Sequence, residues 1–239
     1  MRIKLQKSEI LQESQYKALT FLSMIYITLI LAADVLIYKI VHLGSLTLTV
    51  GSLVTPFWFV MTDIVAEVYG YQMARRLIWS GIACGFLFTV ICVTLIHFPS
   101  PETWPNQPAY DQVLGKLTRV FIGSVAGVIV GAFTNTYLIT KWKILVHGKY
   151  FWLRSVCSSA TGQLAFTVVT LLYDLFGVLP LYQVAQLILI SFTIKLILAL
   201  LCASPSSIIV YYLKKLENID IYDYKTNFNP FKLELKTSS

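Results

Sequence analysis

The chain has 239 residues, of which 56% are hydrophobic and only 13% are charged, and its mean hydropathy is +0.70. About a quarter of the residues of a soluble domain are charged, so this composition excludes an ordinary soluble domain and indicates an integral membrane protein. The net charge of +7 does not indicate nucleic-acid binding, because the basic residues are divided among segments that flank apolar runs.

Six apolar stretches are long enough to cross a bilayer as helices, which takes about 20 residues each. A polar segment, residues 1–17, precedes them, and a polar tail, residues 217–239, follows them. We therefore predict an all-α integral membrane fold with a single six-helix domain over residues 18–216. The expected transmembrane helices are Ala18–Ile40, Ser45–Ala66, Leu77–Phe98, Arg119–Thr140, Ser155–Phe176 and Tyr182–Ser204.

Basic residues predict the orientation of these helices. All but four of the 19 Lys and Arg residues lie in the amino-terminal segment, the second and fourth loops, and the tail; the exceptions are Lys39, Lys116, Arg119 and Lys195. Lys and Arg are enriched in cytoplasmic loops. Both termini are therefore predicted to be cytoplasmic.

Two charged residues lie deep in the first and last spans. Asp34 is placed about two-thirds of the way along the first span, and Lys195 lies near the middle of the last. A lysine at that depth cannot easily reach the interface and needs an anionic partner. Asp34 and Asp63 are the candidates, either as a structural lock between helices or as part of a site.

The second span carries two acids one helical turn apart, Asp63 and Glu67, followed by a tyrosine-glycine break. Such acids repel each other on one helix face, and ionisable groups within the membrane usually face a cavity or the bundle interior. In the alternative interpretation, both acids lie at the cytoplasmic end and are neutralised by Arg75 and Arg76. Pro56 and the aromatic residues after it favour a shaped site.

The fourth and fifth spans offer packing and hydrogen-bonding groups. Gly123, Gly127 and Gly131 recur every four residues, which permits close helix packing within the bundle or between two subunits of a homodimer. Asn135 can donate across helices. The polar first half of the fifth span, which includes Gln163, suits an uncharged, hydrogen-bonding solute.

No motif predicts an enzyme. The cysteines lie inside the spans and the histidines at span ends or in loops, without the spacing of a zinc, haem or disulfide framework. Neither a nucleophile elbow nor a P-loop is present. We therefore expect no catalytic residues, no metal and no cofactor.

Several residues together form a pattern typical of one family. They are Pro56-Phe57, Phe59, Thr62-Asp63, Glu67-Val68-Tyr69-Gly70 and Ala74-Arg75-Arg76 in the second span, Lys39, Ser155-x-x-Ser158-Ser159-x-x-Gly162-Gln163, and Lys195. Over about residues 17–215 the chain resembles the YhhQ-type queuosine precursor transporters, also called the vitamin uptake transporter family. It departs from their pattern twice, with Asp34 in place of an expected Asn and Phe166 in place of an expected Asp, an exchange that would compensate if the two positions face each other.

The resemblance implies a multi-pass protein of the bacterial inner membrane. It would import 7-deazaguanine bases, namely 7-cyano-7-deazaguanine, 7-aminomethyl-7-deazaguanine or queuine, for salvage into tRNA modification. Its partners would be this small molecule and the lipid bilayer.

The residues fit that chemistry. A carboxylate can accept the adjacent N–H and amine of a guanine-like face, aromatic rings can stack on the base, and amides can add hydrogen bonds. We place the site between the second and fifth spans, beside a helix break at Pro56. The candidate substrate-binding residues are Asp63, Glu67, Phe57, Trp58, Tyr69, Asn135, Gln163, Asp34 and Lys195.

Two other functions stay open at this point. The chain could be a vitamin-binding subunit that couples to a separate ATPase, or a membrane-embedded enzyme that acts on lipid. The sequence does not settle which precursor is carried or whether protons are coupled to transport.

Overall fold

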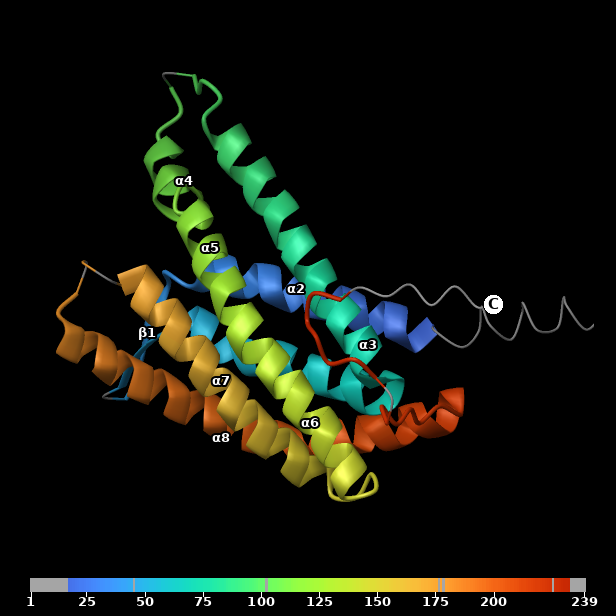
Figure 1. Ribbon diagram of the computed structural model, residues 1–239. Coiled ribbons are helices and arrows are strands. Elements are labelled where there is room, and N and C mark those ends of the chain that lie inside the picture. The colour runs from blue at the N-terminus through green and yellow to red at the C-terminus, as the bar shows by residue number, and fades with distance from the viewer. Residues whose placement is uncertain are drawn as a thin grey trace, which may run out of the picture.

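The computed structural model describes residues 17–44, 46–101, 103–175, 177, 179–224 and 226–232. Most of the described chain is helical (Figure 1). The elements are α2 (Lys17–Leu36), β1 (Ile40–Leu43), β2 (Leu46–Thr49), α3 (Val50–Ile96), α4 (Gln107–Leu114), α5 (Leu117–Gly127), a π-helical turn η1 (Val128–Ala132), α6 (Phe133–Leu145), α7 (Phe151–Leu175) and α8 (Leu181–Glu217). The polar segment predicted before the first span lies outside the described residues up to residue 16.

Among the described residues, five helical runs are long and apolar enough to cross a membrane: Ala18–Leu36, Val50–Ile96, Gln107–Leu145, Phe151–Leu175 and Leu181–Glu217. Large apolar side chains such as Leu87, Leu189 and Leu201 remain exposed on them, as expected of surfaces that face lipid. The chain is therefore a multi-pass, helical membrane protein.

Helix α3 is two helices joined by a sharp turn. Within its 47 residues, Gly70 alone has non-helical dihedral angles (φ 82, ψ 172), a region that glycine enters without strain. Figure 1 shows the chain doubling back there, so that the second arm leads away toward α4. The two arms correspond to the second and third predicted spans.

Three local expectations were wrong. Helix α3 runs through Pro56 without interruption, and α8 continues to Glu217, past Ser204, where the last predicted span ends. Between the first two predicted spans, the chain forms an antiparallel hairpin in which Ile40 pairs with Thr49. The first span accordingly ends earlier than predicted, and the second begins as a strand.

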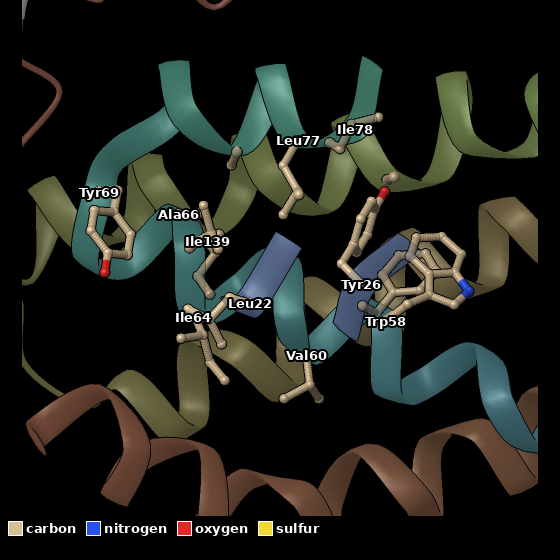
Figure 2. Packing of buried hydrophobic residues seen from close by; sticks show 14 of the residues in the cluster. Leu22, Tyr26, Trp58, Val60, Ile64, Ala66, Tyr69, Leu77, Ile78 and Ile139 are labelled. Carbon is tan, nitrogen blue, oxygen red and sulfur yellow. The ribbon is translucent and has the colours of Figure 1, made fainter. Parts of the chain in front are cut away.

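The core surrounds the first arm of α3. Its Trp58 packs edge-on against Tyr26 of α2, with ring centroids 6.1 Å apart (Figure 2). The predicted glycine repeat packs within the bundle: a Cβ on Gly131 would lie 2.5 Å from the carbonyl oxygen of Gly162 in α7. Close backbone approach therefore fixes the run from α5 to α6 against α7.

The end of the chain packs across the turn at Gly70. Asp223 accepts a hydrogen bond from the backbone N–H of Tyr71 (2.8 Å), and a Cβ on Gly70 would meet an Asp223 oxygen at 3.0 Å. Farther on, Arg75 donates to the carbonyl of Asn229 (2.8 Å) and Trp79 to that of Pro230 (2.8 Å). We call residues 218–224 and 226–232 the C-terminal segment; it covers one end of the bundle.

Candidate functional site

Glu67 is the centre of a buried charge network at the end that the C-terminal segment covers. Its side chain is 1% exposed, and its two oxygens bind Arg154 of α7 (2.9 Å) and Lys214 of α8 (2.7 Å). Lys143 of α6 donates to the Glu67 carbonyl (2.6 Å). Three helices are thus joined to α3 through one acidic residue.

Asp220 completes this network from the C-terminal segment. Its carboxylate contacts Lys143 (2.6 Å) and Lys214 (3.0 Å). Partial burial alone would raise the pKa of Asp220, but the hydrogen bonds and positive charges of the two lysines outweigh burial and lower it. We call Glu67, Lys143, Arg154, Lys214 and Asp220 the inner charge network.

The alternative interpretation, in which Arg75 and Arg76 neutralise the two acids, is wrong about the partners. Arg75 donates to carbonyls of the C-terminal segment, and Arg76 contacts the sulfur of Met73 (3.9 Å). The ends of α7 and α8 supply the cations instead. Both cations stand beside predicted spans, because Arg154 directly precedes the fifth and Lys214 follows the sixth. The sequence does not reveal, however, which helices pack against Glu67.

Asp63 lies one turn from Glu67 in a network of neutral donors. It is fully buried; one oxygen accepts from Asn135 (2.6 Å), and the other accepts from Ser155 (2.6 Å) and Ser159 (3.0 Å). Hydrogen bonds of this kind are what allow a carboxyl group to be buried without an ion-pair partner. Asp63 therefore fixes α6 and α7 to α3.

A narrow cavity lies toward the opposite end of the bundle. Water-sized molecules can occupy about 40 Å³ of it, which is well below the roughly 300–1,000 Å³ of typical small-molecule pockets, so a bound base would have to widen it. It is lined by Ile30, Ala33, Asp34, Ile37, Gly51, Ser52, Thr55, Trp58, Val120, Ser124, Val128, Phe166, Thr170, Leu171, Asp174 and Lys195. We call it the outer cavity.

Charged groups from three helices line the outer cavity. Asp34 of α2 accepts a hydrogen bond from Ser124 (2.9 Å). Lys195 of α8 is 3% exposed, donates to Thr167 (2.9 Å) and lies 5.2 Å from the centre of the Phe166 ring. Within the described part of the chain it forms no ion pair, so the expected pairing with Asp34 or Asp63 was wrong.

Aromatic rings form the inner wall of the outer cavity. Trp58 stacks on Phe59 at 4.2 Å between centroids and meets Phe166 edge-on at 5.4 Å. Asp34 and Phe166, at which we expect the chain to depart from the pattern of the family that it resembles, both line this cavity. They therefore share one site even though they lie on α2 and α7.

The structure divides the nine candidate residues into groups. Asp34, Trp58 and Lys195 share the outer cavity, Asp63 and Asn135 share a hydrogen-bond network, and Glu67 belongs to the inner charge network. Phe57 is 41% exposed and does not line the cavity. The Tyr69 hydroxyl donates to Glu217 (2.5 Å). Gln163 is buried, and its amide has no hydrogen-bond partner among the residues that the structure describes.

Sequence reasoning missed Asp174 as a lining residue. It stands in the last turn of α7 and was not among the nine candidate residues. Its signal was its acidic character inside an apolar run. No cluster of side chains that would suit a metal ion occurs among the residues that the structure describes.

Comparison with known proteins identifies similar chains. A family model described as "Putative vitamin uptake transporter" matches residues 49–211. The "Probable queuosine precursor transporter" of Bacillus subtilis (strain 168) is 28% identical over 170 residues, which cover 69% of this chain and 74% of the relative. The "Queuosine precursor transporter" of Escherichia coli (strain K12) is 23% identical over 157 residues, covering 66% and 68%. No solved structure matches the chain significantly.

Proposed function

Because the chain belongs to the vitamin uptake transporter family, we propose that it imports queuosine precursors, 7-deazaguanine bases such as the 7-cyano base, the 7-aminomethyl base or queuine, across the bacterial inner membrane. The imported base would then enter salvage for tRNA modification. The similar proteins are named transporters, so the chain is a transporter and not an enzyme.

We propose six membrane crossings, with both arms of α3 crossing separately and the inner charge network on the cytoplasmic side. The start of α2 and the end of α8 meet at that side, where the Ala18 N–H donates to Glu217 (3.1 Å). The turn at Gly70 and the start of α7 lie there too, because Glu67 binds Arg154. Basic residues gather at the same end, which supports a cytoplasmic location.

The observation that carries the substrate proposal is Lys195. Lys195 is 3% exposed within a membrane helix and donates to the hydroxyl of Thr167. An ammonium group has three N–H donors, so donors remain for a further acceptor. In the outer cavity it would donate to the ring carbonyl of a deazaguanine. Asp34 would accept the adjacent N–H and amine, and Trp58 and Phe166 would pack against the base plane.

The exchange between Asp34 and Phe166 supports the same class of substrate. From the resemblance we expect a carboxylate in related chains at the position of Phe166, whereas this chain carries one at position 34, and both positions line the outer cavity. The cavity thus keeps a carboxylate on a different wall. A base with the same donor edge could bind in a changed orientation.

The proposal is tested in cells that can neither synthesise nor import queuosine precursors. The chain is expressed, each precursor is supplied separately, and queuosine in tRNA is measured by mass spectrometry. Wild-type protein should restore queuosine, and Lys195→Met should abolish restoration at an equal membrane level. Lys215→Met, an exposed control on the same helix, should not change it. Absence of queuosine with every precursor, despite wild-type protein in the membrane, would refute the proposed function.

A further inference from the structure

Gln163 presents a buried amide that nothing in the described structure satisfies. Its side chain is 1% exposed, and within the described ranges neither its nitrogen nor its oxygen has a hydrogen-bond partner. The Oδ1 atom of Asn135, which is also buried, has no partner in the described part of the chain either. Unpaired buried polar groups cost free energy and call for an explanation by a function or an unseen partner.

Gln163 lies between the two polar regions described above. It is the central residue of the 25-residue α7. One turn away on one side, Ser159 donates to Asp63 (3.0 Å), and one turn away on the other, Thr167 accepts from Lys195 (2.9 Å). Four residues of helix span about 6 Å. The amide therefore occupies the step between the outer cavity and the Asp63 network.

Asn135 and Phe59 approach the same point of α7. A Cβ on Gly162, the neighbour of Gln163, would lie 2.6 Å from the Asn135 Cβ and 3.2 Å from the Phe59 ring. Because a carboxylate only accepts hydrogen bonds, Asp63 fixes the Asn135 amide nitrogen toward itself. The Asn135 oxygen is thereby left as an acceptor.

The unpaired atoms form a recognisable set. Gln163 offers one donor group and one acceptor, and Asn135 adds a second acceptor. A side-chain amide makes a two-point contact with a heterocycle edge on which a hydrogen-bond donor stands beside an acceptor. The ring carbonyl and N–H of an oxopurine-like base form such an edge.

We propose that Gln163 and Asn135 form an inner substrate station, which receives the lactam edge of the base after it leaves the outer cavity. The rings of Trp58, Phe59 and Phe166 pack together; Trp58 and Phe166 line the outer cavity, and Phe59 approaches Gly162 beside the inner station. The base would reach the inner station when these rings part. This inference rests on the proposed function, because it assigns a second step on the path of the same substrate.

The test is Gln163→Leu, which keeps a similar volume and removes the two unpaired polar atoms. If the amide serves the substrate, this variant should be at least as stable as wild type in thermal unfolding, because it loses only unsatisfied groups. Its uptake of radiolabelled precursor should nevertheless fall about tenfold or more, as expected for one lost two-point contact. Equilibrium binding to the purified protein, which reports the outer cavity, should stay within about threefold. Gln186→Leu, an exposed change on α8, should alter neither stability nor uptake.

Uptake by Gln163→Leu at the wild-type rate would overturn the inner station. So would a loss of uptake that accompanies a matching loss of stability, because the amide would then be structural. These outcomes are read only after wild-type protein has been shown to import a precursor. A wild-type chain that imports none would refute the proposed function and not the inner station alone.

Discussion

Replacing Glu67 with glutamine should destabilise the protein strongly, even though the side chain keeps its shape. Glu67 is 1% exposed and is bound at 2.9 Å by Arg154, which is itself 4% exposed, and at 2.7 Å by Lys214. Removing one partner of a buried ion pair leaves an uncompensated charge and costs about 3 to 5 kcal/mol. Asp220 is 40% exposed, whereas its partner Lys143 is 1% exposed. Asp220→Asn should cost less than Glu67→Gln, because Lys143 keeps the carbonyl oxygens of Glu67 and Ile221 as acceptors at 2.6 Å each.

The comparison is made by unfolding both variants and wild type in mixed micelles with increasing sodium dodecyl sulfate. The two changes are chemically alike and touch the same network, so their difference isolates the effect of burial. A Glu67→Gln variant that is no less stable than Asp220→Asn would refute the reasoning, because the inner charge network would then not depend on its buried acid.

Gly131→Ala should lower the free energy of unfolding by about 1 to 3 kcal/mol, because the new Cβ would lie 2.5 Å from a backbone oxygen. Gly85→Ala is the control: its Cβ would meet its nearest neighbour at 3.4 Å, so its stability should be close to that of wild type in the same unfolding assay. Asp174→Asn should reduce uptake of the 7-aminomethyl base about ten- to hundredfold more than uptake of the 7-cyano base, because only the former carries an amine cation that a cavity carboxylate can bind; equal effects on both bases in competition assays would contradict this. The lowered pKa of Asp220 means that its ion pairs stabilise the fold above the ordinary carboxyl pKa of about 3.9 and that this contribution is lost as pH falls through the lowered value. Wild type should therefore lose more stability than Asp220→Asn on acidification below about pH 4, and parallel pH profiles would show that Asp220 contributes nothing.

The helical membrane fold could be predicted because the sequence contains several long apolar runs. Within a bilayer such a run must satisfy its own backbone hydrogen bonds, which a helix does. The position of the turn between the two arms of α3 could also be predicted, because the tyrosine-glycine break at Gly70 comes three residues after Glu67. The weight given to Pro56 was misplaced. Its ring and missing N–H were accommodated within α3, whereas the reversal required the positive φ that Gly70 adopts.

The candidate site was predictable only in part. Charges inside apolar spans are rare, so Asp34, Asp63 and Lys195 were found from the sequence. Their partners were not, because those depend on which helix faces meet: Lys195 donates to Thr167 on α7 and not to an acid. The unpaired state of Gln163 likewise has no signature in sequence spacing.

The position of the C-terminal segment has a consequence for biogenesis. Lys143, Arg154, Lys214 and Asp220 all follow Glu67 along the chain, and Asp220 comes 153 positions after it, so the first arm of α3 enters the bilayer before any of its ionic partners has been synthesised. A nascent chain that stops before α8 would therefore hold an acid with an incomplete set of counter-charges. The inner charge network can therefore be completed only after Asp220 has been translated.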